Sequence, residues 1–431
     1  MNQGLTHDGL RLSFGQQGRW NGAMSDIRID GTRLWRSLME MARIGATPGG
    51  GVGRIALTDL DRQGRDLFVA WCREAGCSVR IDRLGNIFAR RPGRDPTRPP
   101  VVTGSHLDTQ PLGGRFDGIY GVLAGLEAVR ALNDAGIETA APIEVAVWTD
   151  EEGVRFGGAL ASKSFAGLID ADTVLATTAA DGTTFGSELA RIGYAGDAPV
   201  GGPVDAYFEA HIEQGPLLEQ EGKTIGVVLG AQGQRTFQVT VDGEEGHAGT
   251  QPMTQRHDAL LGAARMIEAL NSVAFRHRPH PVITVGELHV RPNSHNTIPG
   301  QVVFTIDSRH PDNVILAQAK AEMAAVCRDI ATKTQLGLAF AETGHRDTVV
   351  FDSACVELVR RAAVGLQLAH RDIYSAAGHD ACYISHAAPT AMIFVPCEKG
   401  ISHNEKENAK PEDLAAGCDV LLRAMLARAA V

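Results

Sequence analysis

Short apolar runs alternate along this chain with longer segments whose apolar residues recur at helical spacing. Runs with the length and apolar character of buried strands cover Ser78–Ile81, Ile87–Arg90, Pro100–Thr103 and Ile143–Trp148. Helical spacing covers Gly31–Ile44, Asp59–Ala75 and Ile119–Asn133. Because strands that alternate with helices pack as a sheet covered by helices, this pattern predicts a layered α/β domain.

The character of the chain changes between about residues 225 and 332. TFQVTVDG, HPVITVGELHV and GQVVFTIDSRH alternate apolar and polar residues, as strands with one covered face do. Helical patterns at Asp258–Asn271 and Asn313–Thr332 separate these strands. We therefore expect a smaller α+β domain at 225–333, inserted into a larger discontinuous domain made of 24–224 and 334–431.

Composition narrows the class of protein. The chain has 431 residues, enough for two or three domains, and its 44% hydrophobic and 21% charged residues are typical of a soluble globular protein. A net charge of −10 argues against a nucleic-acid or anionic-membrane partner, because neither attracts an acidic surface.

The cysteines and the N-terminal segment favour a cytoplasmic protein. The cysteines are scattered without a CxxC pair, which indicates reduced thiols and not a disulfide framework or a thiolate zinc site. The polar N-terminal segment lacks the apolar core of a signal peptide, and no stretch approaches the roughly 18 apolar residues of a membrane span. Met24 is a candidate natural start, and we expect residues 1–23 to be a flexible segment, with a docked N-terminal arm as the alternative.

Polar side chains with ligand or acid–base chemistry follow the expected strands. These are His106 and Asp108, Asp117 in a glycine-rich loop before a helix, Glu151 and Glu152, then His211, Glu213 and Gln214, and finally His403. Because loops that leave the carboxyl ends of strands gather at one edge of an open α/β sheet, we expect these side chains to converge.

Each of these residues has a structural alternative when it is taken alone. A histidine near a strand end is commonly a hydrogen-bonded structural residue, adjacent glutamates commonly form a solvated loop, and Asp117 can cap the helix after it. Their joint occurrence without a thiolate is harder to explain in this way. Histidine and carboxylate ligands suit zinc, or manganese, nickel or cobalt, so the pattern favours a hydrolytic metal site.

A set of ordered motifs resembles the M20-type amidohydrolases of the hydantoinase/carbamoylase group. The motifs are GSHLDT, GGRFDGIYGVLAGLE, DEEGVRF, HIEQGPLLE, GHAGTQPM, RPNSHNTIPG, AAGHDA and GISHNEKE. Any one of them is weak, but the match keeps its order over nearly the whole chain. The group includes N-carbamoyl-L-amino acid hydrolases, β-ureidopropionases and allantoate amidohydrolases. The resemblance implies a discontinuous α/β metallohydrolase domain, with the inserted domain as a lid and as the interface of a homodimer.

The resemblance also implies two divalent metal ions per subunit, with zinc expected and manganese, nickel or cobalt as alternatives. His106, Asp117 and His211 would hold one ion. Asp117 would also reach the second ion as a bridge, joined there by Glu152 and His403. A bridging carboxylate holds two ions at the roughly 3.5–4 Å separation of two-metal hydrolases.

Three further residues receive roles near the metals from the resemblance. Asp108 would orient His106 through its other ring nitrogen, with a turn aspartate as the alternative. Glu151 would be the general base, taking a proton from the water that attacks a ureido carbon and passing it to the leaving nitrogen. His247 would stabilise the developing oxyanion, with an ordinary turn residue as the alternative. Relatives usually have asparagine before this histidine, where this chain has Gly246.

Gln214, Asn296 and Arg309 match positions that bind substrate in relatives, and Gly378 and His379 are expected to line the substrate pocket. An arginine suits a substrate carboxylate because its planar fork makes paired, charge-assisted hydrogen bonds. A surface salt bridge is the alternative for Arg309. We expect closure of the lid to bring its substrate-binding residues and the oxyanion histidine to the metals.

The expected substrate is a small ureido acid, either an N-carbamoyl-L-amino acid or an N-carbamoyl-β-amino acid. Allantoate amidohydrolase is the nearest alternative, since it would share the metals and the base and differ only in the pocket. An M20 peptidase or deacylase fits GRFDGIYGV and HIEQGP less well. A non-catalytic binding protein on the same fold is disfavoured because Glu151 and all the implied ligands are present.

Overall fold

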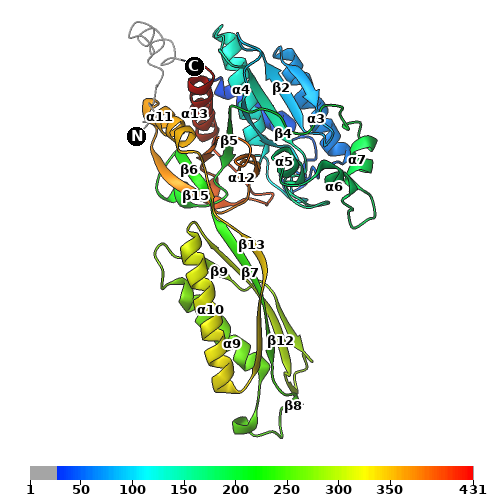
Figure 1. Cartoon of the computed structure of the whole chain (residues 1–431), viewed down its shortest axis with the longest axis vertical. Helices are drawn as coiled ribbons and strands as arrows, with labels where there is room; N and C mark the ends of the chain where they lie inside the picture. The colour runs from blue at the N-terminus through cyan, green and yellow to red at the C-terminus, as the bar shows by residue number, and fades with distance from the viewer. Residues whose placement is uncertain (1–26, 431) are drawn as a thin grey trace, which may run out of the picture. The chain divides into compact units, whose positions relative to one another are not determined.

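The computed structural model describes residues 27–430, which form two compact units (Figure 1). Unit 1 contains the chain up to Leu229, Phe351–Ile373 and the residues from His379 onward, and unit 2 contains Gly230–Val350 and Tyr374–Gly378. The expected flexible segment 1–23 and the candidate start Met24 lie outside the described residues. Within the described range, no helix has both the length and the apolar character needed to cross a membrane.

Unit 1 combines a mixed sheet with helices. Its strands are β1 (Ser78–Ile81), β2 (Ile87–Arg91), β3 (Val101–His106), β4 (Ile143–Trp148), β5 (Ala206–Ile212) and β16 (Thr390–Val395). Two more strands run from unit 1 into unit 2 or back, namely β6 (Ile225–Ala231) and β15 (His370–Ser375). The helices are α2 (Gly31–Met41), α3 (Asp59–Glu74), α4 (Ile119–Asp134), α5 (Leu160–Phe165), α6 (Ala171–Ala176), α7 (Phe185–Arg191), α8 (Leu217–Gln220), α11 (Ser353–Gly365), α12 (Asp380–Ile384), η2 (Glu398–Gly400) and α13 (Pro411–Ala429).

The centre of this sheet is parallel and buried on both faces. The strand order runs β1-β2-β4-β3-β5-β16-β6, and the pairings of β3 with β4, β3 with β5 and β5 with β16 are parallel. Every residue of these four strands is buried, as expected for strands that helices cover on both faces. α4 and α13 pack together and contact β3 and β5, and α12 contacts the same two strands. The expected α/β layering is confirmed.

Parallel pairing brings the candidate site residues to one edge of the sheet. His106, the last residue of β3, is in register with Trp148, the last residue of β4. His211, near the end of β5, is in register with Phe394 on β16. The loops that leave these strands therefore start side by side.

Unit 2 is an antiparallel sheet with helices on one face. Its strands are β7 (Gly233–Asp242), β8 (Gly246–His247), β9 (Val282–Thr284), β10 (Leu288–Arg291), β11 (Thr297–Ile298), β12 (Gln301–His310), β13 (Gly337–Arg346) and β14 (Val349–Val350). Its helices are η1 (Met253–Gln255), α9 (Ala259–Ala274) and α10 (Asn313–Thr334). The main sheet has the order β10-β12-β7-β13, with β9 also on β12, and β8 and β11 form a separate ribbon.

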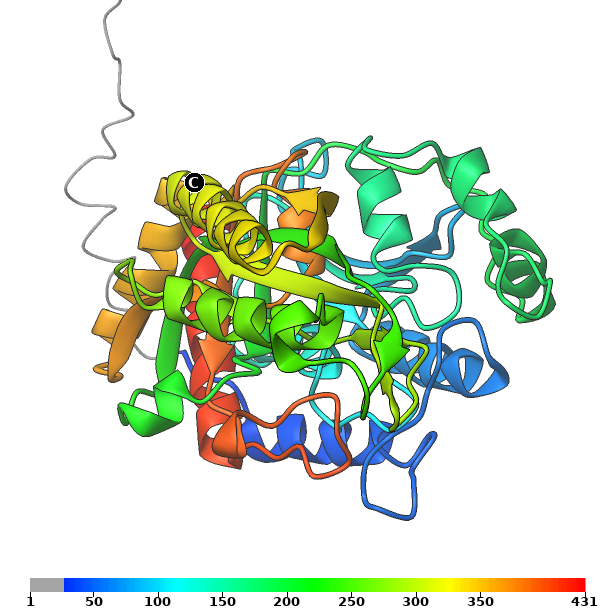
Figure 2. The same ribbon diagram turned by 90° about the horizontal axis from the view of Figure 1, so that it is seen from below.

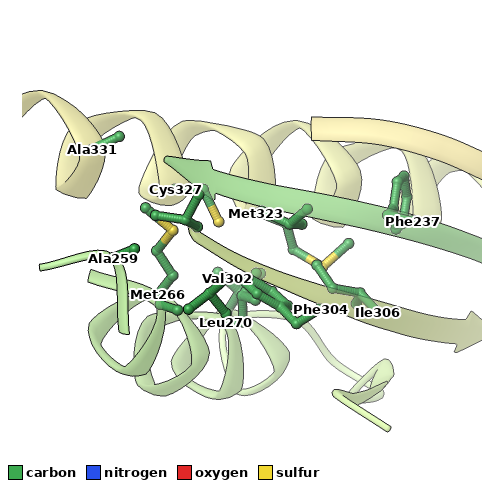
Figure 3. Packing of buried hydrophobic residues seen from close by; sticks show 14 residues of the cluster. Phe237, Ala259, Met266, Leu270, Val302, Phe304, Ile306, Met323, Cys327 and Ala331 are labelled. Carbon is green, nitrogen blue, oxygen red and sulfur yellow. The ribbon is translucent and has the colours of Figure 1, made fainter. Parts of the chain in front are cut away.

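The core of unit 2 lies between this sheet and the paired helices α9 and α10 (Figure 2). Burial alternates along β7 and β12, which confirms the one-sided strands expected from the sequence. Phe237 and Phe304 from the strands meet Met266 and Leu270 from α9 and Met323 from α10 (Figure 3). The helices thus bury the apolar side of each strand.

The domain boundary expected at residue 333 is wrong. β13 pairs with β7 from Gly337 opposite Asp242 to Arg346 opposite Gln234, so the segment up to 350 belongs to unit 2. The boundary expected at 225 coincides with the start of β6, but residues 226–228 of this strand pair with β16 of unit 1, and unit 2 begins at Gly230. The sequence hides β13 because GLAFAETGHR has only two large apolar residues and is largely exposed.

Candidate active site

The five implied metal ligands come together at the carboxyl edge of the sheet of unit 1. His106 and His211 lie on β3 and β5, while Asp117, Glu152 and His403 lie on loops after β3, β4 and β16. Their side chains form two groups, His106–Asp117–His211 and Asp117–Glu152–His403, in which the candidate ligand atoms all lie within 4.8 Å of one another. Asp117 belongs to both groups.

Hydrogen bonds in the first group fix which nitrogen of each histidine faces its centre. Nδ1–H of His106 donates to the carbonyl oxygen of Asp108, and Nδ1–H of His211 donates to that of Ile212, both at 2.9 Å. The Nε2 atoms of His106 and His211 lie 4.0 and 3.1 Å from Oδ1 of Asp117. Metal-binding histidines are typically held in this way, with the second ring nitrogen bonded to a carbonyl or carboxylate.

Asp108 contacts the other ring nitrogen of His106, as expected, but through its backbone carbonyl and not through its carboxylate. The backbone carbonyl of Asp108 meets Nδ1 of His106, whereas Oδ1 of its side chain is 3.9 Å away. Oδ2 instead accepts a hydrogen bond from the backbone N–H of Glu152 at 3.1 Å. The chain turns directly after β3, so the carbonyl reaches the ring and the carboxylate is left to join the β3 and β4 loops.

The carboxylate of Asp117 divides its two oxygens between the groups. Oδ1 faces His106 and His211, and Oδ2 lies 3.3 Å from Nε2 of His403. The same Nε2 lies 3.4 Å from Oε2 of Glu152. Asp117 does not cap α4. The N-cap residue is Gly118, and no side chain makes a cap hydrogen bond at this helix end.

Gly118 allows the Asp117 loop to approach β3. Its φ is 72°, in the left-handed region that favours glycine. A Cβ at this position would lie 2.3 Å from Cε1 of the His106 ring, closer than real contacts allow. Glycine is therefore required at position 118 for two reasons, the left-handed backbone conformation and the close approach of the His106 ring.

Glu151 lies beside the first group, and Glu152 points to the second. Oε2 of Glu151 is 3.6 Å from Nε2 of His106, while Oε2 of Glu152 accepts a hydrogen bond from Nε2 of Gln110 at 2.8 Å. Asp150 has a φ of 62°, which turns the chain at the end of β4. The alternative of two solvated glutamates fails, since their side chains are only 14% and 5% exposed.

The electrostatics of the two groups favour a bound cation. Burial raises the pKa of Glu151 well above its usual range, although His106 opposes this shift. The hydrogen bond to Asp117 raises the pKa of His403 to about 9. Burial raises the pKa of Asp117, but its contacts with His211 and His403 outweigh burial and hold it well below the usual range. Protons on such histidines are replaced when a metal binds.

The donor set fits a divalent metal ion. It consists of imidazole nitrogens and carboxylate oxygens, and the buried free cysteines of the chain are not part of either group. Borderline ions such as zinc accept these ligands, and carbonyl groups already orient two of the histidines.

Gln214 and His379, both expected to bind substrate, lie against the ligand groups. Nε2 of Gln214 donates to Oδ2 of Asp117 at 2.9 Å and to Oγ of Ser402 at 3.1 Å. His379 is 2% exposed, and its ring meets that of His211 edge-on with the centroids 4.5 Å apart. His379 thus packs against a ligand in the interior, and the substrate roles of both residues remain predictions.

Glu209 is a buried residue that the sequence analysis missed. Its carboxylate accepts hydrogen bonds from Oγ of Ser105 at 2.7 Å and from the backbone N–H of Ala381 at 2.9 Å. A carboxylate oxygen of Glu209 and one ring nitrogen each of His211 and His379 lie within 4.8 Å of one another. The signal was present in the sequence, since Glu209 is a charged residue inside the otherwise apolar start of AYFEAHI.

Glu407 is a second buried residue that the sequence analysis missed, and it follows His403 by four residues in GISHNEKE.

His247 and Asn296 lie together on the β8–β11 ribbon of unit 2. His247 is in register with Thr297, and the backbone N–H of Ala248 donates to the carbonyl oxygen of Asn296 at 3.0 Å. Nδ1 of His247 accepts a hydrogen bond from the N–H of Gly249 at 3.0 Å. The neutral ring then carries its proton on Nε2, which can donate to an oxyanion.

The loop around His247 is held despite the glycine before it. A Cβ at Gly246 would lie 1.9 Å from Oε1 of Gln251, so the side chain of Gln251 occupies the space next to this position. Nη2 of Arg256 donates to the carbonyl oxygens of Ala248 at 2.6 Å and Gln251 at 2.8 Å. Arg256 therefore supports the loop that carries His247.

Arg309 takes part in a salt bridge within unit 2. Its Nε and Nη2 donate to the two oxygens of Asp307 at 2.9 and 3.2 Å, and its Nη1 donates to the carbonyl oxygen of Ala376 at 3.0 Å. In this structure, the guanidinium of Arg309 therefore forms the salt bridge that the sequence analysis gave as the alternative to substrate binding. Its expected binding to a substrate carboxylate remains a prediction.

The length of β12 separates Arg309 from the β8–β11 ribbon, which Figure 1 shows at one end of unit 2. Arg309 is opposite Gln234, and Gln301 is opposite Asp242 at the other end of the ladder, next to the ribbon. Eight residues of extended strand span about 26 Å, much more than a small ureido acid. A single copy of unit 2 therefore does not bring Arg309 and the ribbon to the same small ligand. The expected approach of Arg309, His247 and Asn296 to the metals remains a prediction.

Comparison with known proteins places the chain among relatives of similar length. Residues 102–427 match the peptidase family M20/M25/M40. An N-carbamoyl-L-amino-acid amidohydrolase of Rhizobium meliloti is 49% identical over 406 residues, covering 94% of this chain and 98% of the relative. A ureidoglycolate hydrolase of Arabidopsis thaliana is 34% identical over 420 residues, covering 94% of this chain and 88% of the relative. The crystal structure of an amidase of the hydantoinase/carbamoylase family from Burkholderia multivorans is 56% identical and has a TM-score of 0.91, with 94% of this chain and 99% of that chain covered.

These matches extend over most of the chain and include every residue of the two ligand groups. They agree with the ordered motifs and with the α/β fold of unit 1. The chain belongs to the peptidase family M20/M25/M40, within its hydantoinase/carbamoylase group.

Proposed function

We propose that this protein hydrolyses the ureido C–N bond of N-carbamoyl-L-amino acids and releases the amino acid, carbon dioxide and ammonia. The observation that carries this proposal is the carboxylate of Asp117, which gives one oxygen to each ligand group, with Glu151 3.6 Å from a ligand of the first group. The names of its relatives support the substrate class.

Two divalent ions per subunit are proposed, one in each ligand group. Zinc is the first candidate, and manganese, nickel and cobalt are alternatives that the same ligands accept. Such ions, when bound, supply a more acidic water and a positive charge that stabilises negative charge on oxygen.

Glu151 is the proposed general base. Its carboxylate takes a proton from water, whose oxygen bonds to the ureido carbon. The bond from this carbon to the nitrogen of the amino acid then breaks, and the protonated Glu151 delivers its proton to that nitrogen. The carbamic acid that remains decomposes to carbon dioxide and ammonia.

His247, Asn296 and Arg309 are proposed to recognise the substrate, with the guanidinium exchanging Asp307 for the substrate carboxylate. His247 would donate from Nε2 to the oxyanion. Because β12 keeps Arg309 far from the other two residues, we propose a homodimer in which each site takes Arg309 and the β8–β11 ribbon from different copies. Unit 2 is then both lid and interface.

Three residues complete the proposed pocket, namely Gln214, Gly378 and His379. Gln214 already donates to the carboxylate of Asp117, and within residues 27–430 its amide oxygen has no hydrogen-bond partner, so this oxygen would be the atom that accepts from a substrate N–H. Asp108 supports the site by joining the loops after β3 and β4.

Ammonia release from metal-reconstituted protein tests the reaction. N-carbamoyl-L-amino acids, N-carbamoyl-β-alanine, allantoate and ureidoglycolate are offered in parallel, and the Glu151→Gln variant is the control. We expect hydrolysis of N-carbamoyl-L-amino acids by the wild-type protein and its loss in the variant. No ammonia from any of the four ureido acids, with release of amino acid from N-acyl amino acids or peptides given to the same protein, would overturn the proposal.

A ureidoglycolate or allantoate substrate is the second candidate, because a named ureidoglycolate hydrolase is among the relatives. Both are ureido acids that need the same base and the same carboxylate binder. The ratio of kcat/KM values among the four substrates decides between the candidates, since they differ only in what the pocket contacts.

A further inference from the structure

A buried carboxylate ties the loop that carries His403 to the loop that carries Asp117. This carboxylate belongs to Glu407, which is 1% exposed. Its Oε1 accepts hydrogen bonds from the backbone N–H groups of Phe116 at 2.8 Å and Asp117 at 3.2 Å. Its Oε2 accepts a hydrogen bond from Oγ of Ser402 at 3.1 Å. One side chain thus holds donors from both loops.

Ser402 completes this connection next to the ligands. Its Oγ lies 3.0 Å from Oδ2 of Asp117, and it directly precedes His403 in the chain. Asp117 is therefore held through its backbone by Glu407, and the single hydroxyl proton of Ser402 lies where it can be donated to the carboxylate of either Asp117 or Glu407. The side chain of Ser402 is thus placed between these two carboxylates.

The space for this carboxylate is provided by a glycine. A Cβ at Gly114 would lie 1.9 Å from Cδ and 2.0 Å from Oε1 of Glu407. No side chain fits at Gly114 unless Glu407 moves away from the Asp117 loop. The second glycine of GGRFDG and the last glutamate of GISHNEKE are therefore in contact.

His403 depends on this contact more than the other two histidines do. Backbone carbonyls hold Nδ1 of His106 and of His211. Over residues 27–430, no such hydrogen bond holds Nδ1 of His403, and its side chain is 52% exposed. The position of His403 relative to Asp117 is therefore set by the fold of its own loop.

We propose that Glu407 is a positioning residue that sets the spacing of Asp117 and His403 and thereby the affinity for the ion of the group Asp117–Glu152–His403. This inference rests on the proposed two-metal function. The ion of the first group should depend less on Glu407, because His106 and His211 have their own carbonyl partners. Loss of a residue that orients a metal ligand typically lowers metal affinity about 10- to 100-fold.

Titration of the metal-free protein with cobalt(II) tests this inference without any substrate. The absorption of bound cobalt reports the ligand environment, and elemental analysis gives the number of ions. We expect two ions in the wild-type protein and a second ion bound about 10- to 100-fold more weakly in Glu407→Gln, with a larger loss in Glu407→Ala. The first ion should change little in both variants.

Glu405→Gln is the matched control in the same loop. Its carboxylate accepts a hydrogen bond from the backbone N–H of Gly49 at 3.1 Å, and within residues 27–430 it makes no hydrogen bond or ion pair with the loops that carry Asp117 and Glu152. We expect both cobalt ions to bind this variant as they bind the wild-type protein. Circular dichroism of the metal-free variants reports whether each is folded.

The outcomes separate this inference from the proposed function. If the wild-type protein and a folded Glu407→Ala bind two ions with equal affinities, the positioning role is wrong and the two-metal function stands. An equal loss of both ions also overturns the positioning role. If the wild-type protein binds no second ion, the two-metal function itself fails. If the Glu407 variants do not fold, Gly114→Ala displaces the intact carboxylate, and wild-type affinity for the second ion in Gly114→Ala would overturn the inference.

Discussion

The two units of this chain present their candidate functional residues in opposite ways. In unit 1, parallel strands end at one edge of a buried sheet, and the ligands from His106 to His403 meet there although they are far apart in the sequence. In unit 2, the antiparallel β12 places Arg309 at one end and the ribbon with His247 and Asn296 at the other. The first arrangement gathers residues, and the second keeps them apart.

This difference indicates which steps of the proposed reaction use residues of unit 1 alone and which use residues of unit 2. Both candidate ligand groups and the proposed base Glu151 lie in unit 1, so metal binding and proton transfer need no residue from unit 2. The residues proposed for substrate recognition cannot meet at one small molecule within a single unit 2. Chemistry and recognition should therefore respond differently to mutation.

The largest expected effect follows from changing Glu151, the proposed base in unit 1. Glu151→Gln removes the group that accepts the proton from water, and general-base catalysis contributes about 10²- to 10⁴-fold. We expect kcat for ureido hydrolysis to fall by that factor while metal content stays at the wild-type level, because Glu151 belongs to neither ligand group. Ammonia release and elemental analysis measure the two quantities. Retained activity would show that the chemistry lies elsewhere.

The second effect tests the separation of residues in unit 2. His247→Ala removes a proposed oxyanion donor and should lower kcat about 10²- to 10³-fold, and Arg309→Ala should raise KM by removing the partner of the substrate carboxylate. Co-expression of the two variants should recover about a quarter of the wild-type activity, since half of the C2 dimers are mixed and each has one intact site.

The control for this experiment is co-expression of either variant with itself. Recovery in the mixed sample but not in the controls is the expected result. No recovery, with mixed dimers verified by tagging each copy differently, would mean that both residues act within one copy, and the comparison between the units would lose its basis.

The sequence predicted the parts of the molecule that depend on local pattern. Strand ends follow from apolar runs, and the parallel sheet that brings His106 and His211 together follows from their alternation with helices. The assignment of Asp117 as a bridge came from the resemblance to a family, not from the pattern. Its two-sided position in the structure agrees with that role.

Features that depend on the exact path of the backbone could not be predicted. Which atom of Asp108 meets His106 is decided by a turn after β3. β13 carries too few apolar residues to be recognised before its pairing with β7 is known. The distance between Arg309 and His247 follows from the pairing register of β12 with β7. The sequence does not reveal this register, so it does not show that the two residues lie near opposite ends of the strand.

The third effect concerns the close approach of loop and strand in unit 1. Gly118→Ala would place a Cβ 2.3 Å from Cε1 of the His106 ring, so this ligand must move, and we expect metal affinity to fall about 10- to 100-fold. Gly136→Ala is the matched control, because Gly136 also has a positive φ, 62°, but nothing lies within 4 Å of its Cβ position. The control should lose only about 1 kcal/mol of stability. Competition with a chelating dye measures the affinities, and equal values in the two variants would contradict the role of Gly118.

The smallest effect on metal binding is expected from the core of unit 2. Leu270→Ala opens a cavity between α9 and the sheet and should lower the stability of unit 2 by about 2–5 kcal/mol. Leu261→Ala, an exposed leucine on the same helix, is the control and should change stability little. Hydrogen exchange should show less protection of β7, β12 and α10 in Leu270→Ala, with β3 and β5 unchanged. Cobalt affinity should equal that of the wild-type protein, since none of the ligands lies in unit 2. Equal loss of protection in β3 and β5 would show that the two units unfold together and that the metal site is not independent of the region that recognises substrate.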